Sequence, residues 1–276
     1  MWRRYRLRRI IYLLPLLILP IAALITLPAT NAVTWSTVTS PTSSNLYSVF
    51  CVNASDCWAV GYGAIVQWNG VSWSTVTNSS LNNLWSVFCV SSSNCWAVGA
   101  GGKSGSGLIV QWNGVSWATV TIPYSNALNS VYCNSSTDCW AVGWAGTAIH
   151  WNGNSWATAS SPTTNNLWSV FCVSSSNCLT VGYGTSRFTQ AGSIFQWNGA
   201  SWTPISSPNS TYLDSVFCVS ASNCWTVGYN FIAQWNGSSW ATVTSPTSTF
   251  LNSVYCASAS NCWAVGAGGT IIRSNP

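Results

Sequence analysis

Six cysteine pairs set the framework of this chain. Five residues separate the two cysteines of each pair, and none of the 12 cysteines is left over. Every pair occupies the same place in a longer unit, which begins L-x-S-V-[FY]-C and, after a short polar loop, typically continues C-W-A-V-G. The sequence therefore contains six repeats. The pairs are Cys51 and Cys57, Cys89 and Cys95, Cys133 and Cys139, Cys172 and Cys178, Cys218 and Cys224, and Cys256 and Cys262.

The first five repeats continue into an apolar run ending in Q-W-N-G, or H-W-N-G in the third, and then into S-W-x-x-V or a close variant. Four short apolar runs recurring every roughly forty residues are typical of a propeller blade. No segment after Val33 has helical periodicity. We therefore predict an all-β protein, a six-bladed β-propeller of four-stranded blades.

The two ends of the repeat region carry complementary fragments. The N-terminal fragment, residues 34–38, matches only the fourth run, and the C-terminal fragment from Ile271 matches only the third. We therefore expect a strand around Trp35 to complete the last blade and close the ring, which removes exposed sheet edges. Asn-Gly pairs such as Asn69-Gly70 join the third and fourth runs and predict type I′ hairpins.

The N-terminal segment differs in composition from the repeats. Five arginines among the first nine residues precede an apolar run over residues 10–27, and small residues follow up to Ala32. This pattern predicts a signal peptide over residues 1–32 and a propeller over residues 33–276. The alternative is an uncleaved membrane anchor over residues 10–27. We expect a secreted or cell-surface protein that meets a membrane only through that segment.

The cysteine spacing fits disulfides in an exported protein, one bridge per blade. A zinc site needs clustered ligands, whereas these pairs are spread over six repeats, so we expect no metal and no cofactor. After residue 32 the chain has three cationic and three anionic side chains. Without a basic surface it is not expected to bind nucleic acid, and we expect a monomer.

The C-W-A-V-G and Q-W-N-G-x-S-W motifs resemble those of a family of secreted bacterial repeat propellers. More distantly, the chain is similar to propellers with sialidase-type Asp-box repeats and to photosystem-assembly-factor-like propellers. The resemblance implies the fold and says little of activity, because the motifs are turn and core residues. A sialidase would need an arginine cluster and acidic partners, but this chain has no glutamate.

The carboxylates do not form an obvious catalytic set. Asp56 and Asp138 directly precede a second cysteine, where we expect an Asx side chain to cap the turn. Asp214 alone cannot supply both a general acid and a general base. His150 stands where most repeats have glutamine, which predicts a structural hydrogen bond. We therefore predict no enzyme.

One face of the disc carries the variation. Loops between the second and third runs are longest in repeats two and four, where they carry Lys103 and Arg187. Variable loops on a rigid scaffold commonly carry binding sites. The position x of L-x-S-V opens on the same face. Its occupants are Tyr47, Trp85, Asn129, Trp168, Asp214 and Asn252.

Aromatic rings, amides and one carboxylate resemble a sugar-binding surface. We predict that the six x residues, together with Lys103 and Arg187 of the long loops, bind a ligand. The alternative is that the six x residues are ordinary half-exposed strand ends. We predict a non-catalytic binding or adhesion propeller for carbohydrate or another cell-surface polymer. The alternatives are an envelope scaffold for cell-surface protein partners, and a hydrolase or lyase with a site around Asp214, His150 and Arg187.

Overall fold

The structure is a computed structural model that describes residues 37–76, 83–102, 105–123, 126–161, 163–184, 192–208 and 212–274. By its contacts the chain divides into two units, residues 1–38 and residues 39–276, and every strand of the described residues lies in the second. The predicted signal peptide, Trp35, Lys103 and Arg187 lie outside the described residues. Within the described part of the chain, no helix is long and apolar enough to span a membrane.

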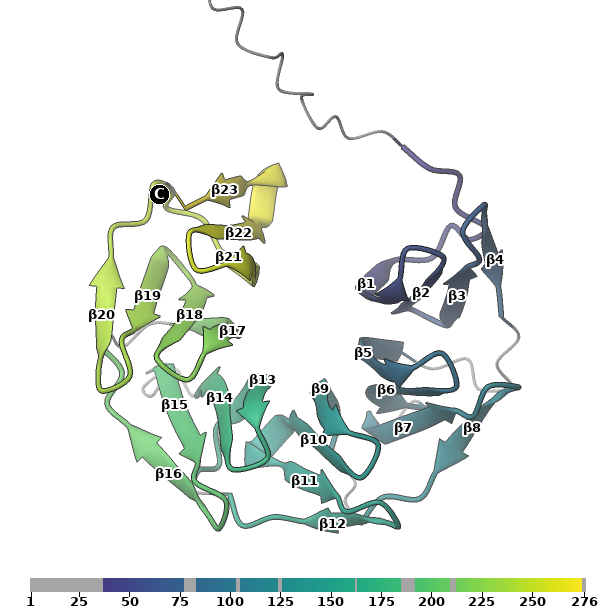
Figure 1. Ribbon diagram of the computed structural model, residues 1–276, viewed down its shortest axis with the longest axis horizontal. Coiled ribbons are helices and arrows are strands. Elements are labelled where there is room, and N and C mark those ends of the chain that lie inside the picture. The colour runs from purple at the N-terminus through teal and green to yellow at the C-terminus, as the bar shows by residue number, and fades with distance from the viewer. Residues whose placement is uncertain are drawn as a thin grey trace, which may run out of the picture. The chain divides into compact units, whose positions relative to one another are not determined.

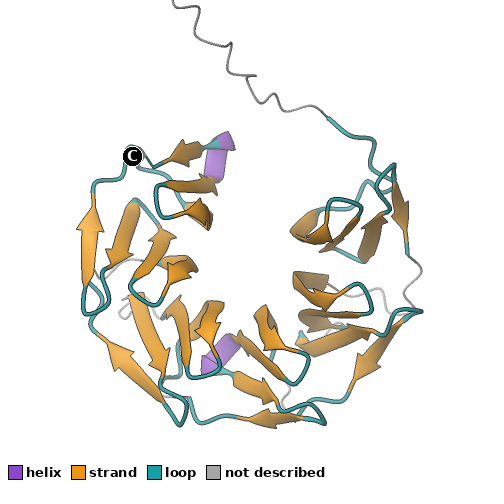
Figure 2. Ribbon diagram, viewed as in Figure 1, coloured by secondary structure: helices purple, strands orange, loops and turns teal. Residues whose placement is uncertain are grey.

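Six antiparallel sheets follow one another along the second unit (Figure 1), with almost no helix (Figure 2). The predicted six-bladed β-propeller is confirmed. The first three blades are β1 (Leu46–Asn53), β2 (Asp56–Gly61), β3 (Ala64–Trp68) and β4 (Trp73–Thr75); β5 (Asn83–Ser91), β6 (Asn94–Gly101), β7 (Ser106–Trp112) and β8 (Trp117–Val120); and β9 (Leu128–Ser135), β10 (Asp138–Gly143), β11 (Ala148–Trp151) and β12 (Trp156–Thr158).

The other three are β13 (Asn166–Ser174), β14 (Asn177–Tyr183), β15 (Gly192–Trp197) and β16 (Trp202–Ile205); β17 (Leu213–Ser220), β18 (Asn223–Gly228), β19 (Phe231–Trp235) and β20 (Trp240–Val243); and β21 (Leu251–Ser258), β22 (Asn261–Gly266) and β23 (Ile271–Arg273). Short 3₁₀ turns, Trp144–Gly146 and Ala267–Gly269, precede β11 and β23. The last blade has three strands among the described residues, and Thr37 and Val38 belong to no strand. The fourth strand predicted around Trp35 stays a prediction.

The first strand of each blade is the innermost. Figure 1 shows β1, β5, β9, β13, β17 and β21 nearest the centre, and each of the first five contacts the first strand of the next blade. One disulfide joins the first two strands of every blade, as predicted. In blade one, Cys51 lies directly opposite Cys57 across the hairpin, with their Cα atoms 3.9 Å apart. The bridges are Cys51–Cys57, Cys89–Cys95, Cys133–Cys139, Cys172–Cys178, Cys218–Cys224 and Cys256–Cys262.

The second cysteines of the bridges belong to the core, which the sequence does not predict. Four of them are at most 2% exposed and pack into four different apolar clusters. These four are Cys95, Cys139, Cys178 and Cys224. They are therefore structural residues without access to a ligand, and their bridges add to the packing of the blades.

The Asn-Gly connections are not type I′ turns, which corrects the sequence prediction. Gly70 has a φ of +92°, but Asn69 does not have the positive φ that a type I′ turn requires. Instead, four residues separate the paired Trp68 and Trp73. The Asn69 side chain accepts hydrogen bonds from the backbone N–H groups of Val71 and Ser72. The asparagine therefore folds the loop through its side chain.

The core lies between blades, and tryptophans fill much of it. Trp58 of β2 is fully buried, and its ring lies 4.7 Å from Trp112 and 5.2 Å from Trp117 of the next blade. Trp96 and Trp140 each contact two tryptophans of the following blade in the same way. These rings confirm the prediction that the repeated tryptophans are mainly structural.

A β-bulge begins every blade. In blade one Leu46 pairs with Gly61 and Ser48 pairs with Val60, so that Tyr47 has no partner in the ladder. The same register shift leaves the x residue of every L-x-S-V motif unpaired. Bulges redirect side chains and are frequent beside functional sites. All six x residues are therefore held by one backbone device, and we call them the bulge residues.

Candidate functional site

The six bulge residues line one cavity. It has a volume of about 390 Å³, and each blade contributes its bulge residue: Tyr47, Trp85, Asn129, Trp168, Asp214 and Asn252. Trp144, in the 3₁₀ turn of blade three, completes the lining. The structure thus brings together side chains separated by more than two hundred positions in the sequence. We call this cavity the axial pocket.

A glycine in the second strand makes each bulge possible. Gly182 lies opposite Leu167, and a Cβ atom there would stand 2.0 Å from the backbone oxygen of Asn166. The equivalent glycines of the other blades approach a backbone oxygen just as closely. Because any side chain would collide with backbone, the last residue of C-W-A-V-G must be glycine. The motif that indicated the fold therefore also shapes the site.

Two buried acceptors in the axial pocket have no hydrogen-bond partner. Asn129 is 7% exposed, and its Nδ2 donates to the Leu167 backbone oxygen at 2.7 Å, which leaves Oδ1 unpaired. The Oδ2 of Asp214 is also buried and unpaired. Every other unpaired buried side-chain atom in the described residues is a tryptophan Nε1, that of Trp168 among them. Buried acceptors without partners are costly, and they indicate a donor supplied by water or a ligand.

Stacked aromatic pairs stand at two sides of the pocket. Trp85 of blade two stacks on Trp144 of blade three, with ring centroids 6.0 Å apart and planes 24° apart. Trp168 stacks on Tyr183, 5.4 Å away at 20°. Tyr47 and Trp144 are 51% and 43% exposed. The pocket therefore offers ring faces that solvent, or a ligand, can reach.

Burial perturbs the one carboxylate of the pocket. It raises the pKa of Asp214 from 3.8 to about 6, because the charged form loses hydration. The pKa of Tyr183 is raised to about 12, first by burial and then by the negative charges of Asp214 and Tyr212. Among the described residues, Asp214 is the only acidic side chain that lines the pocket, and none of the lining side chains is cationic.

The sequence predicts six of the pocket residues on one face but does not predict Trp144. This tryptophan occupies the position after C-W-A-V-G, which is aromatic in four repeats, as Tyr62, Trp144, Tyr183 and Tyr229. That recurrence is the available signal, but aromatic residues at strand ends are common in propeller cores as well. Lys103 and Arg187, the other two predicted ligand-binding residues, lie outside the described residues.

His150 lies elsewhere and has a structural partner. Its Nε2 is 2.7 Å from Oδ1 of Asp138, and it does not line the axial pocket. Gln67 donates to Asp56 in the same way, as the equivalent glutamines do to asparagines. The predicted structural role of this position is therefore confirmed. The aspartate or asparagine before the second cysteine therefore bonds to the glutamine or histidine of the third strand and does not cap the hairpin turn between the two cysteines. The N–H groups of that turn are bonded instead to side chains such as Asn53.

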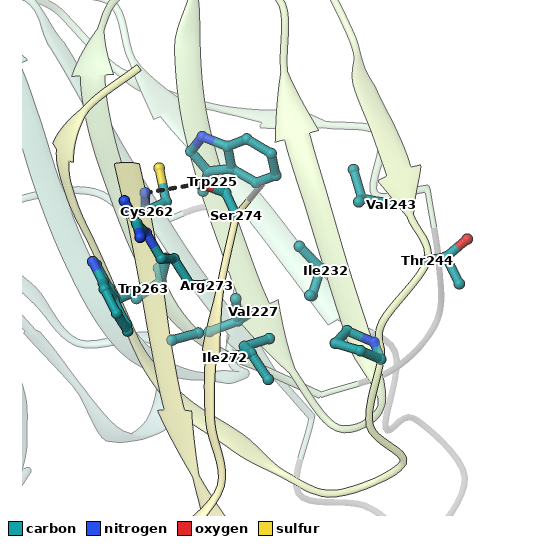
Figure 3. A pocket seen from close by; sticks show the side chains of 13 residues that line it. Trp225, Val227, Ile232, Val243, Thr244, Cys262, Trp263, Ile272, Arg273 and Ser274 are labelled. Carbon is teal, nitrogen blue, oxygen red and sulfur yellow. Dashed lines mark hydrogen bonds between the residues drawn. The ribbon is translucent and has the colours of Figure 1, made fainter. Parts of the chain in front are cut away.

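A second cavity lies between the last two blades (Figure 3) and has a volume of about 320 Å³. Trp225, Ile232 and Val243 line it from blade five, and Ile272 and Ser274 from blade six. At the first three junctions the second-strand tryptophan contacts two tryptophan rings of the next blade, but here Ser274 occupies one of those ring positions. The cavity is thus explained by the packing of the last blade and offers few polar groups.

Comparison with known proteins gives the fold alone. No family model matches the chain, and no curated protein sequence does. The structure "YCF48 bound to D1 peptide" has a TM-score of 0.69 at 15% identity, covering 90% of this chain and 83% of that one. For YCF48 from Cyanidioschyzon merolae the TM-score is 0.67 at 15% identity, with 88% and 86% covered.

The WD40 β-propeller domain of Doa1 is more distant, with a TM-score of 0.54 at 14% identity, covering 84% of this chain and 92% of that one. These similarities are consistent with the resemblance to photosystem-assembly-factor-like propellers. At this level of identity the similarities show the fold and no activity.

Proposed function

We propose that this protein is an exported, non-catalytic binding propeller that recognises carbohydrate or another cell-surface polymer in the axial pocket. The observation that carries the proposal is the convergence of all six bulge residues on one cavity. A merely structural strand end would not require the same bulge to present aromatic, amide and carboxylate side chains toward a common space. Six disulfides fit an oxidising, extracellular environment.

The chemistry of the lining favours a polyhydroxylated ligand. Sugar hydroxyls can donate to the unpaired oxygens of Asn129 and Asp214, and the Nε1 of Trp168 can donate in return. The exposed faces of Tyr47 and Trp144 can pack against the apolar faces of sugar rings. Each donor supplied by the ligand would relieve an acceptor that is costly to leave unpaired.

The pocket does not favour hydrolysis. Glycosidases of the common kinds use two carboxyl groups flanking the scissile bond, and Asp214 is the one carboxyl group lining this pocket. His150, part of the site considered for a hydrolase or lyase, is paired with Asp138 away from the pocket. The described residues therefore give binding a better basis than catalysis.

A scaffold for protein partners is the second candidate. It is supported by the structural similarity to YCF48, which is described as bound to a D1 peptide. A peptide could also donate to Asn129 and Asp214 and pack on the pocket rings. The two candidates differ in ligand class and use the same pocket. One set of pocket variants therefore shows whether a ligand of either class binds in the axial pocket or elsewhere on the protein.

The test is a glycan-array screen of the oxidised protein, followed by titration calorimetry with each bound glycan. Trp168→Ala and Asn129→Ala are expected to lower affinity about tenfold, because they remove a ring face and a buried acceptor. The control is Tyr62→Ala, which removes an exposed aromatic side chain that does not line the pocket. It should leave affinity unchanged.

Binding of envelope proteins or peptides without glycan binding, lost in the same two variants, would support the scaffold candidate instead. Ligand binding that survives both variants would refute a role for the axial pocket. Circular dichroism and the melting temperature of each variant show whether a loss of binding reflects a loss of the fold.

A further inference from the structure

Aromatic side chains form a continuous row beside the axial pocket, from blade four to blade six. Trp168, which lines the pocket, stacks on Tyr183, and Tyr183 meets Tyr212 edge to face at a centroid distance of 4.4 Å. Tyr212 contacts both Tyr229 and Phe250, whose rings lie 4.6 Å apart. We call Tyr183, Tyr212, Tyr229 and Phe250 the aromatic ledge.

The ledge is built from two repeat positions that adjoin the bulge. Tyr183 and Tyr229 follow the glycine that ends the second-strand motif. Tyr212 and Phe250 precede the leucine of L-x-S-V. Tyr229 and Phe250 form a β-bridge, and a side chain on Gly228 would collide with the Tyr212 backbone oxygen. The backbone that holds the bulge residues therefore also holds the ledge next to them.

The scaffold does not require aromatic residues at these positions. Before the motif leucine the first four blades have asparagine or alanine, and yet they form the same bulge. After the motif glycine, blades two and six have alanine. Among the described residues, aromatic side chains at these two positions adjoin one another only from blade four to blade six. The row is therefore a local feature of the chain, which points to function.

The outer end of the ledge is open to solvent. Tyr229 and Phe250 are 43% and 39% exposed, and Tyr183 and Tyr212 are partly buried. No ledge side chain carries a formal charge at neutral pH, and the three tyrosine hydroxyls can donate and accept hydrogen bonds. A surface with apolar ring faces and polar edges suits a chain of sugar rings, which are themselves apolar on their faces and polar at their edges.

We propose that the axial pocket and the aromatic ledge together bind one linear, uncharged polysaccharide chain. The pocket holds one part of the chain, and the ledge holds the sugar units that follow. This inference rests on the proposed function and narrows its ligand to a polymer of several sugar units. The carboxyl group of Asp214, beside the start of the ledge, disfavours an acidic chain.

Continuity between the pocket and the ledge carries the proposal. Trp168 belongs to the pocket and stacks on the first ring of the ledge, so a chain that leaves the pocket there meets Tyr183 next. Sugar rings and tyrosine rings are of similar size, and one sugar unit therefore covers about one ring face. A single sugar in the pocket would leave the exposed Tyr229 and Phe250 without a contact.

Titration calorimetry with glycans of two lengths tests the proposal. The probes are the disaccharide and the hexasaccharide of cellulose, of chitin and of the linear glycan that binds most strongly on the array. The hexasaccharide is expected to bind at least about thirtyfold more tightly than the disaccharide, because it also reaches the ledge. In the double variant Tyr229→Ala/Phe250→Ala this ratio should fall to about fivefold or less, the gain from the several positions in which a hexasaccharide can occupy the pocket alone.

The matched control is Tyr62→Ala, which changes the same repeat position as Tyr229 in blade one. Tyr62 is 61% exposed, and its bridge partner is Asn83, so this tyrosine belongs to no aromatic row. The control should keep the wild-type ratio. Circular dichroism and the melting temperature of each variant show that it is folded, which is expected because the substituted side chains are exposed.

The possible failures are distinguishable. Similar affinity for both lengths in the wild-type protein, with binding that still requires Trp168, would overturn this proposal and leave the proposed function standing. A thirtyfold ratio that survives the double variant would place the additional sugar units elsewhere on the protein and would also overturn it. Absence of binding by every glycan would refute this proposal together with carbohydrate recognition, and peptide binding lost in the double variant would then assign the ledge to a protein partner.

Discussion

Asp214 is the residue whose chemistry departs most from its ordinary state. A carboxyl group with a pKa of about 6 is partly protonated in mildly acidic solution, where an exposed aspartate is charged. Protonated, it can donate a hydrogen bond; ionised, it can only accept. The axial pocket can therefore offer a ligand two different hydrogen-bonding patterns within an ordinary range of pH.

The buried carboxyl group should make stability depend on pH. Its pKa is higher in the folded state, about 6, than the unfolded value of 3.8, so the folded state binds more protons between these values. The free energy of unfolding should therefore fall as pH rises from about 4 to about 6 and level off above, by no more than about 3 kcal/mol. Solvent screening of this half-buried group reduces that figure.

Asp214→Asn is expected to abolish this fall, as measured by urea unfolding followed by tryptophan fluorescence across that pH range. Asp56→Asn is the control, because it removes a carboxyl group outside the pocket, and it should keep the fall. If Asp214→Asn retained the wild-type pH dependence, burial of this carboxyl group would not be its source.

At the scale of the element, the bulge joins fold and site. The register shift that leaves Trp168 unpaired requires the close approach of Gly182 to the neighbouring backbone. The same pairing repeats in every blade, so the fold itself presents six positions whose side chains can vary without changing the scaffold. The side chains at these positions can therefore be selected for ligand binding while the scaffold stays the same.

We expect Gly182→Ala to damage both stability and the site. The new Cβ would meet backbone, which cannot move aside as a side chain can, so the loss should exceed about 1 kcal/mol. Gly268→Ala is the comparison, because it meets no atom within 4 Å and is strained only by a φ of +65°, which costs about 1 kcal/mol.

Thermal unfolding and ligand titration of both variants provide the measurements. Gly182→Ala should weaken ligand binding by displacing Trp168, whereas Gly268→Ala should not. Equal stability and unchanged binding in Gly182→Ala would show that the bulge does not hold the site in place.

Much of the blade could be predicted because its signals are local. Cysteine spacing, strand length and tryptophan positions indicate the sheets and the disulfides. The burial of cysteines such as Cys139 could not be predicted, because it depends on packing against other strands. The Asn-Gly turn was misassigned because a dipeptide does not reveal loop length. In this longer loop only Gly70 has a positive φ, and the Asn69 side chain holds the loop by hydrogen bonds. Trp144 was missed because its contact with Trp85 crosses between blades.

At the scale of the whole molecule, the axial pocket joins the first blade to the last. Tyr47 belongs to the first blade and Asn252 to the last, and both line the pocket. Each is one residue from the serine of its motif, and Ser253 corresponds in the repeat to the serines that accept a hydrogen bond from the next blade. A ligand that contacts both side chains therefore connects the two end blades.

We therefore expect ligand binding and the packing of the last blade against the first to stabilise each other. A saturating glycan identified by the array should slow hydrogen exchange of the Val49 amide and leave the internal Val131 amide unchanged, because binding to the form with packed end blades shifts the equilibrium toward it. Ser253→Ala, which removes the acceptor expected to face the Val49 amide and does not change a side chain that lines the pocket, should weaken glycan binding, because part of the binding free energy is then needed to hold the two end blades together. If Ser253→Ala bound the glycan with wild-type affinity while the ligand still protected Val49 in the wild-type protein, the pocket and the packing of the end blades would not be coupled.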